Sequence, residues 1–140
     1  MDKEEVVMTC WLYQMTNDYY SHGRYRTEVW EGHPVTNWSI GESKRKPTEV
    51  LPGDMVILFF AKTGAREPGI YGWGIITLFD KEVIDFRPAS PSDYLKMNPL
   101  WDDEISDIVD EIRGGMPQGT MWEVDDEALE QLRQKIAEHV

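Results

Sequence analysis

Short apolar runs, separated by polar segments rich in glycine and proline, fill the first two thirds of the chain. The clearest run, Met55–Phe60, is apolar at every position and rich in β-formers, which is typical of a strand buried on both faces. Similar runs predict further short strands over residues 6–13, 35–40, 70–78, 81–87 and 120–124. The pattern therefore indicates five or six strands.

The C-terminal third changes to a helical period. Isoleucine and valine recur at i, i+3, i+4 and i+7 over residues 101–112, which predicts an amphipathic helix with an acidic outer face. Gly114 follows this segment, as glycine commonly follows a helix. Asp125 is then expected to cap a second helix. The apolar stripe of that helix contains Ala128, Leu129, Leu132 and Ile136.

Glycines mark the centre of the predicted sheet. Gly53 suits a tight turn before the strand Met55–Phe60, and Asp54 is expected to accept hydrogen bonds from backbone amides there. In the following strand, Gly72 and Gly74 predict a bulge or a close approach of another group. Runs of strands followed by helices indicate an α+β fold, and short strands with glycine interruptions favour a curled sheet or a small barrel.

The composition limits the number of domains, the cellular location and the partners that we expect. With 140 residues, the chain is expected to form a single domain over residues 1–140. The single cysteine, the acidic N-terminus and the lack of a long apolar segment favour a cytoplasmic protein without a membrane association. The net charge is −12, with 4 basic and 13 acidic residues over positions 91–140 but 7 basic and 6 acidic over positions 20–75. The acidity therefore belongs mainly to the C-terminal third, where the simplest interpretation is a solvated face.

The sequence contains no recognisable catalytic set. The three histidines are far apart, which argues against a metal site, and Gly69, Gly72 and Gly74 precede no helix, which argues against a phosphate-binding loop. Cys10 lies in an apolar run and is interpreted as a small buried side chain rather than a nucleophile. We therefore expect a protein without cofactor, metal or enzymatic activity.

The aromatic residues suggest binding instead. Six tryptophans are many for this length, and several are expected to lie together in the sheet: Trp11, Trp30, Trp38, Tyr71 and Trp73. Packing of the core explains any single one of them. The set together also suits a cage around a flat base, with Asn37 and Ser39 at its polar edge, as in proteins that extrude a modified nucleotide into a pocket.

The order of these motifs resembles the EVE domain, a member of the PUA-like superfamily that also includes the YTH and ASCH domains. The resemblance spans roughly residues 6–124, and its most specific part is the Gly53-Asp54 turn followed by Gly69-Ile70-Tyr71-Gly72. Its other elements are Trp11-Leu12, Trp30, Asn37-Trp38 and a segment before the last strand, residues 117–120. The chain departs from the family in its acidity and in carrying Gln14-Met15-Thr16-Asn17 where relatives have a lysine-threonine-glutamate-proline-like stretch.

The resemblance implies a PUA-like pseudobarrel of five or six mostly antiparallel strands with flanking helices. It also implies a non-enzymatic module that binds DNA or RNA and holds a modified base in an aromatic pocket. The pocket residues would be Trp11, Trp30, Asn37, Trp38, Ser39, Phe60, Tyr71 and Gly72. The phosphate contacts would come from Arg24, Arg26, Lys44, Arg45 and Lys46.

Two alternatives remain open at this stage. One is a protein-interaction module that uses its acidic C-terminal helices to dock a basic partner. The other is an RNA-cleaving enzyme of the ASCH type, which would need convergent lysine, tyrosine and threonine or histidine side chains.

Overall fold

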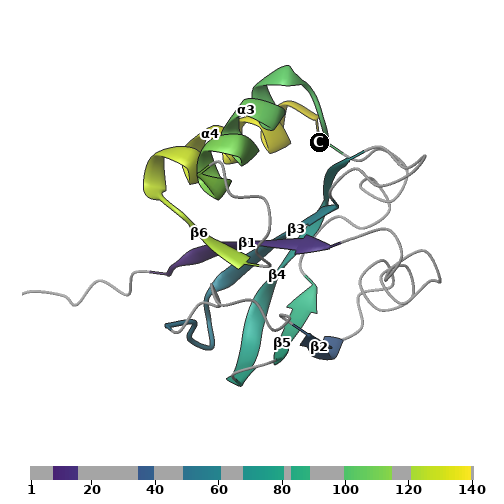
Figure 1. Ribbon diagram of the computed structural model, residues 1–140, viewed down its shortest axis with the longest axis vertical. Helices are drawn as coiled ribbons and strands as arrows, with labels where there is room; N and C mark the ends of the chain where they lie inside the picture. Colours follow the sequence, from purple (N-terminus) through teal and green to yellow (C-terminus); the bar gives the residue numbers. More distant parts are fainter. Residues whose placement is uncertain are drawn as a thin grey trace, which may run out of the picture.

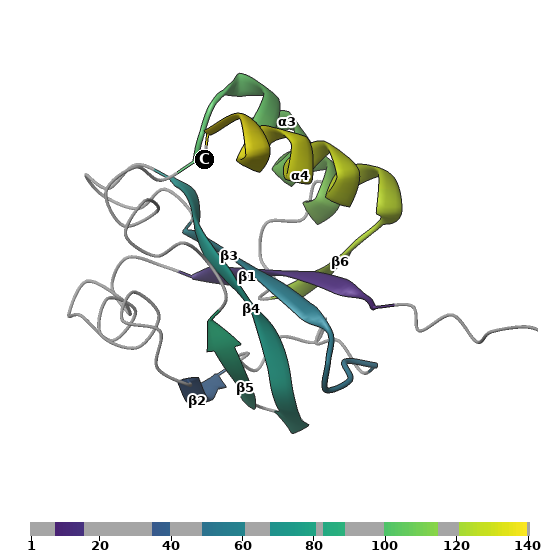
Figure 2. The same ribbon diagram turned by 180° about the vertical axis from the view of Figure 1, so that it is seen from behind.

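The computed structural model describes residues 8–15, 35–39, 49–60, 68–80, 83–88, 100–114 and 121–139. These residues form an α+β structure in which two helices lie side by side on one face of a twisted six-stranded sheet (Figures 1 and 2). The strands are β1 (Cys10–Met15), β2 (Val35–Ser39), β3 (Met55–Phe60), β4 (Gly69–Asp80), β5 (Val83–Pro88) and β6 (Met121–Val124). The helices are α3 (Asp103–Arg113) and α4 (Asp126–His139).

The sheet has the strand order β2-β5-β4-β3-β1-β6. Four of its pairings are antiparallel, and β1 and β3 pair in parallel. Within the described residues, β2 pairs only with β5 and β6 only with β1, so the sheet is open and is not closed into a barrel. The predicted α+β class and the mostly antiparallel pairing are confirmed, whereas the predicted closure into a small barrel is not seen among the described strands, since β2 and β6 do not pair with each other.

The apolar run of β3 occupies the middle of the sheet, as its composition predicts. Because successive side chains of a strand point to opposite faces, Val56 and Leu58 pack on one face while Ile57 and Phe59 pack on the other. We call the cluster beneath the helices the helix-side core and the other one the opposite-side core. The helix-side core contains Cys10, Leu12, Ile70, Ile105 and Val109 among its buried residues. The opposite-side core includes Trp11, Tyr13, Ile76, Ile84 and Phe86.

The first helix ends before Gly114 and the second begins after Asp125, as the sequence predicts, while the first begins at Asp103 rather than at residue 101. The Asp102 side chain accepts a hydrogen bond from the Ile105 amide at 2.8 Å, and Gly114 ends α3 in the left-handed conformation at φ 60°. Asp125 accepts from the Ala128 amide at 2.8 Å in the same capping geometry. The buried stripes of the two helices then close the helix-side core, which fixes the helix pair over the sheet.

Candidate functional site

The turn before β3 holds three segments of the sheet together. Gly53 adopts φ 99°, which glycine reaches without steric cost, and its amide donates to the Ile76 carbonyl at 2.8 Å. Asp54 is 5% exposed, and its carboxylate accepts from the amides of Leu51 at 2.9 Å and Thr9 at 3.3 Å. The predicted turn and the hydrogen bonds from Asp54 to backbone amides are confirmed. The Gly53-Asp54 turn therefore has a structural role that accounts for both residues.

Trp11 completes that arrangement. Its indole Nε1 donates to Asp54 Oδ2 at 3.0 Å, and its ring lies in the opposite-side core with 6% of its surface exposed. The indole thus satisfies its single polar atom inside the protein, as a buried tryptophan requires. A role for Trp11 as a wall of a base pocket stays a prediction, and only the small exposed part of the ring would be available to a ligand.

The strands β1, β3 and β4 meet at one edge of the sheet, which we call the strand-end edge. The parallel strands β1 and β3 end together there, with Met15 opposite Phe60, and β4 begins there, with Gly69 opposite Phe60. The ladder between β3 and β4 shifts close by, so that Tyr71 is an extra residue between two paired positions. Bulges of this kind redirect side chains and are frequent beside functional sites. The bulge predicted from the glycines of β4 is confirmed.

Arg113, a cation that was not among the predicted site residues, lies near the strand-end edge. Arg113, in the last turn of α3, is 16% exposed and its guanidinium donates to Gln14 Oε1 at 2.9 Å and to Asp110 Oδ1 at 2.8 Å. Its Cζ atom lies 5.6 Å from the centre of the Phe59 ring, which in turn stacks on Trp101 at 5.6 Å. The buried Nε atom of Arg113 has no hydrogen-bond partner. In the sequence, Arg113 looks like an ordinary cation at a helix C-terminus, so no local signal links it to the sheet.

A second group of predicted pocket residues lies on β2. Trp38 is opposite Ile84 of β5, which is opposite Phe79 of β4. Phe79 follows Tyr71 by eight residues, which is about 25 Å along a strand at about 3.3 Å per residue. The ladder between β2 and β5 also contains a bulge, between Val35 and Trp38. Along the sheet, the backbones of the two groups are therefore separated.

The expectation that the aromatic residues lie together is wrong for Trp11 and Trp73. Trp11 is opposite Val56, and Val56 is opposite Gly74, the neighbour of Trp73 in β4. Because adjacent residues of a strand point to opposite faces, Trp73 packs against the helix-side core while Trp11 lies in the opposite-side core. Trp11 is therefore a core residue on one face of the sheet, and Trp73 is a partly buried residue on the other.

The remaining predicted site residues are outside what the structure describes. Trp30 and all the predicted phosphate contacts lie outside the described residues: Arg24, Arg26, Lys44, Arg45 and Lys46. For several others the backbone is described and the side chain is not: Asn37, Trp38, Ser39, Phe60 and Tyr71. Gly72 is described, buried in β4 and opposite Leu58. The roles of all these residues stay predictions.

The described residues contain neither a group of metal ligands nor a membrane-spanning helix. No group of three or more histidine, cysteine, aspartate or glutamate side chains among them is placed to hold a metal ion. Neither of the two described helices is long and apolar enough to cross a bilayer.

Cys10 is buried, as predicted, with 2% of its surface exposed. Burial raises the pKa of its thiol to about 12; the charge of Arg133 partly opposes this shift, and Asp54 adds a smaller contribution to it. The thiolate, which is the reactive form, is therefore scarce near neutral pH.

We expect the folded protein to react with a thiol reagent such as Ellman's reagent at pH 8 far more slowly than the same protein unfolded in guanidinium. The chain has one cysteine, so the absorbance change reports on this thiol alone. Rapid stoichiometric labelling of the folded protein would contradict the buried position of Cys10.

The fold is similar to that of a hypothetical protein from Leishmania major, whose structure has been solved. The similarity covers 96% of this chain and 98% of that one, with a TM-score of 0.71 and 12% sequence identity. No protein-family model and no curated protein matches the sequence. At this identity the likeness shows the fold alone, and the assignment of a function has to be argued from the residues of this chain.

Proposed function

We propose that this protein is a non-enzymatic, PUA-like nucleic-acid-binding module that holds a modified base, as its resemblance to the EVE domain implies. The observation that carries the proposal is the bulge of β4 at Tyr71, beside Gly72 and next to the paired ends of β1 and β3. Phe60, Tyr71 and Gly72, three of the predicted pocket residues, share this short stretch of backbone. The strand-end edge is therefore the position we propose for the base.

The chemistry of this edge suits a flat, polar ligand. Glycine at position 72 leaves room for close approach, and the aromatic rings of Phe60 and Tyr71 would provide stacking, which contributes about 1–3 kcal/mol per base. The guanidinium of Arg113 and the amide of Gln14, which lie in contact nearby, supply donors and an acceptor that a base edge or a phosphate can use. The predicted phosphate contacts, Arg24 and Arg26 with residues 44–46, would then bind the backbone on either side.

The β2 residues define a rival position for the same pocket. Asn37, Trp38 and Ser39 match the pocket segment that the EVE resemblance implies, yet their backbone pairs with β5, away from the strand-end edge. One base does not span both positions along the sheet. Substitution of Tyr71 and, separately, of Trp38 shows which of the two positions binds the base.

We expect short oligonucleotides to quench the tryptophan fluorescence of the protein at low salt when they carry the recognised base. The strands would be plain or contain 5-methylcytosine, 5-hydroxymethylcytosine or N6-methyladenine, as DNA and as RNA. Saturable quenching by one modified strand, with Tyr71→Ala abolishing it and Trp38→Ala reducing it little, would support the strand-end edge. Leu78→Ala is the control on the same strand, because Leu78 is exposed and lies seven residues from Tyr71.

Other outcomes of this titration would overturn parts of the proposal. Loss of binding in Trp38→Ala with Tyr71→Ala unaffected would move the base to β2. Unfolding of Trp38→Ala, seen by circular dichroism, would show that Trp38 belongs to the core. No response to any strand would exclude base reading, and cleavage of the RNA strands would show that the protein is an enzyme.

A further inference from the structure

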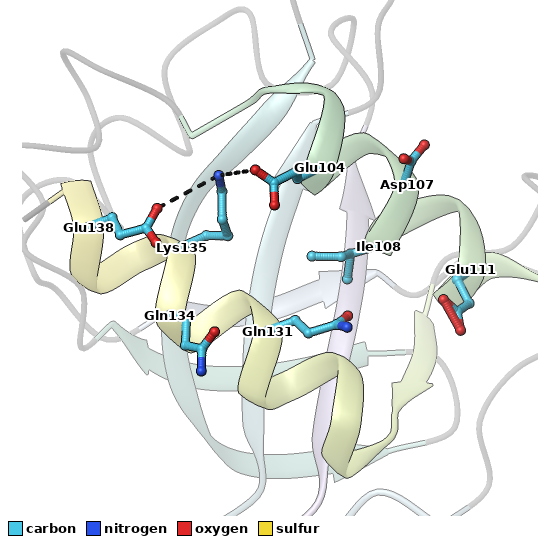
Figure 3. Close-up of a pocket in the computed structure, with 8 residues that line it drawn as sticks. All are labelled: Glu104, Asp107, Ile108, Glu111, Gln131, Gln134, Lys135 and Glu138. Atoms are coloured by element: carbon cyan, nitrogen blue, oxygen red, sulfur yellow. Dashed lines mark hydrogen bonds and ion pairs between the residues drawn. The ribbon is translucent and has the colours of Figure 1, made fainter.

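A groove of about 420 Å³ lies between α3 and α4 (Figure 3). Its walls come from residues at i, i+3, i+4 and i+7 on both helices. They are Glu104, Asp107, Ile108 and Glu111 of α3, and Gln131, Gln134, Lys135 and Glu138 of α4. Six of these eight side chains are exposed, so the groove opens to solvent, and buried Ile108 lies between the helices.

At one end of the groove, a lysine already pairs with carboxylates of both helices. Lys135 is 12% exposed, and its ammonium lies 2.7 Å from Asp102 Oδ2, 3.2 Å from Glu104 Oε1 and 3.8 Å from Glu138 Oε1. The hydrogen bonds from Lys135 to Asp102 and Glu104 raise the pKa of the ammonium to about 12, so it stays charged. This end therefore shows how carboxylates of the two helices together hold a cationic side chain.

The other end carries negative charge without such a partner. Within the described part of the chain, Asp107 and Glu111 form no ion pair. Their i, i+4 spacing places like charges side by side, which destabilises a helix. Glu111 also lies in the last turn of α3, where the helix dipole disfavours a carboxylate. A cation bound between them would relieve both repulsions.

We propose that this groove docks an extended, basic segment of a partner protein. A lysine or arginine of that segment would pair with Asp107 and Glu111, and its aliphatic part would lie over Ile108. The amides of Gln131 and Gln134, on the facing wall, both donate and accept, which suits the backbone of an extended peptide. Seven residues of α3 span about 10 Å, a length that about three or four residues of an extended peptide match.

The charge of the groove selects against nucleic acid. Four of its lining residues are carboxylates and one is a lysine, so phosphates would be repelled. The groove is on the helix-covered side of the molecule, whereas the base proposed above would bind at an edge of the sheet. The two proposals rest on different residues, so each can fail without the other.

The test measures binding of fluorescein-labelled peptides to the full chain by fluorescence anisotropy. The probe is a short peptide of alternating arginine and alanine, and its control contains citrulline, which keeps the shape of arginine without its charge. We expect saturable binding of the arginine peptide, which weakens as salt is raised, and no binding of the citrulline peptide. Equal binding of both peptides, or of neither, would overturn the proposal.

Paired variants locate the binding on the protein. We expect D107N/E111Q to weaken binding of the arginine peptide by about tenfold. The matched variant E123Q/E130Q removes the same charge from exposed positions outside the groove and should change the affinity less than about twofold. The melting temperature of D107N/E111Q should not fall, since like-charge repulsion is removed. Equal weakening by both variants would show non-specific attraction to an acidic protein and would overturn the groove as the site.

Discussion

Replacement of Asp54 by alanine is expected to lower the free energy of unfolding by about 3–5 kcal/mol, because it leaves three hydrogen-bond donors without an acceptor. The donors are the indole of Trp11 and the amides of Thr9 and Leu51, which meet at this one carboxylate. These donors come from the segment before β1, from β1 itself and from the turn, so the loss loosens the start of the parallel pair. Urea unfolding followed by circular dichroism measures the change.

Two control variants distinguish the effect of losing the hydrogen bonds from the effect of losing a negative charge. Glu123→Ala removes a carboxylate from an exposed position of β6, opposite Trp11 in the ladder, and should change stability by less than about 0.5 kcal/mol. Asp54→Asn keeps an acceptor for Trp11 and should cost less than Asp54→Ala. A loss below about 1 kcal/mol in Asp54→Ala would contradict the stabilising role of the hydrogen bonds that Asp54 accepts.

Replacement of Gly74 by alanine is expected to cost about 1–3 kcal/mol, because the new methyl group has no space. A Cβ at this position would lie 2.6 Å from the Arg87 carbonyl oxygen and 3.0 Å from Phe86 Cδ2. The carbonyl belongs to the backbone of β5, and β4 is held by β3 on its other side, so neither strand moves easily. Thermal and urea unfolding of the variant would show the loss.

Two further glycine variants test whether crowding is the cause. Gly74→Val should be more destabilising than Gly74→Ala, since the larger side chain increases the overlap. Gly114→Ala has free space and a φ of 60°, so its cost is conformational and should be about 1 kcal/mol. If neither alanine nor valine at position 74 lowers the stability, the close approach of β4 and β5 at Gly74 would be contradicted.

The two proposed ligands differ in how they relate to the charge of the protein. The strongly acidic C-terminal third forms the helices and their groove, where basic peptide would bind. The near-neutral part of the sequence contains β2, β3 and the start of β4, together with most of the residues that would touch nucleic acid. The variant D107N/E111Q distinguishes the two ligands, because it should weaken binding of the basic peptide without weakening any binding of oligonucleotides.

The secondary structure of the described residues was largely readable from local pattern. The apolar run Met55–Phe60 became β3 with unchanged bounds, α4 begins after the predicted cap Asp125, and α3 ends at the predicted Gly114. These features depend on side-chain periodicity and on hydrogen bonds between near neighbours, which the sequence states directly. The first strand was less well predicted: Met8 and Thr9 precede it, and β1 begins at Cys10.

The neighbours of each element were decided by the tertiary structure. Periodicity does not say that β1 pairs in parallel with β3, nor that Trp11 and Trp73 occupy opposite faces, because both depend on strand register. The contact of Arg113 with Gln14 joins residues 99 positions apart. The groove between α3 and α4 likewise exists only because both helices cover the same face. The sequence by itself determined the elements, their caps and the charge of the helices, whereas register and packing decided which of these residues meet.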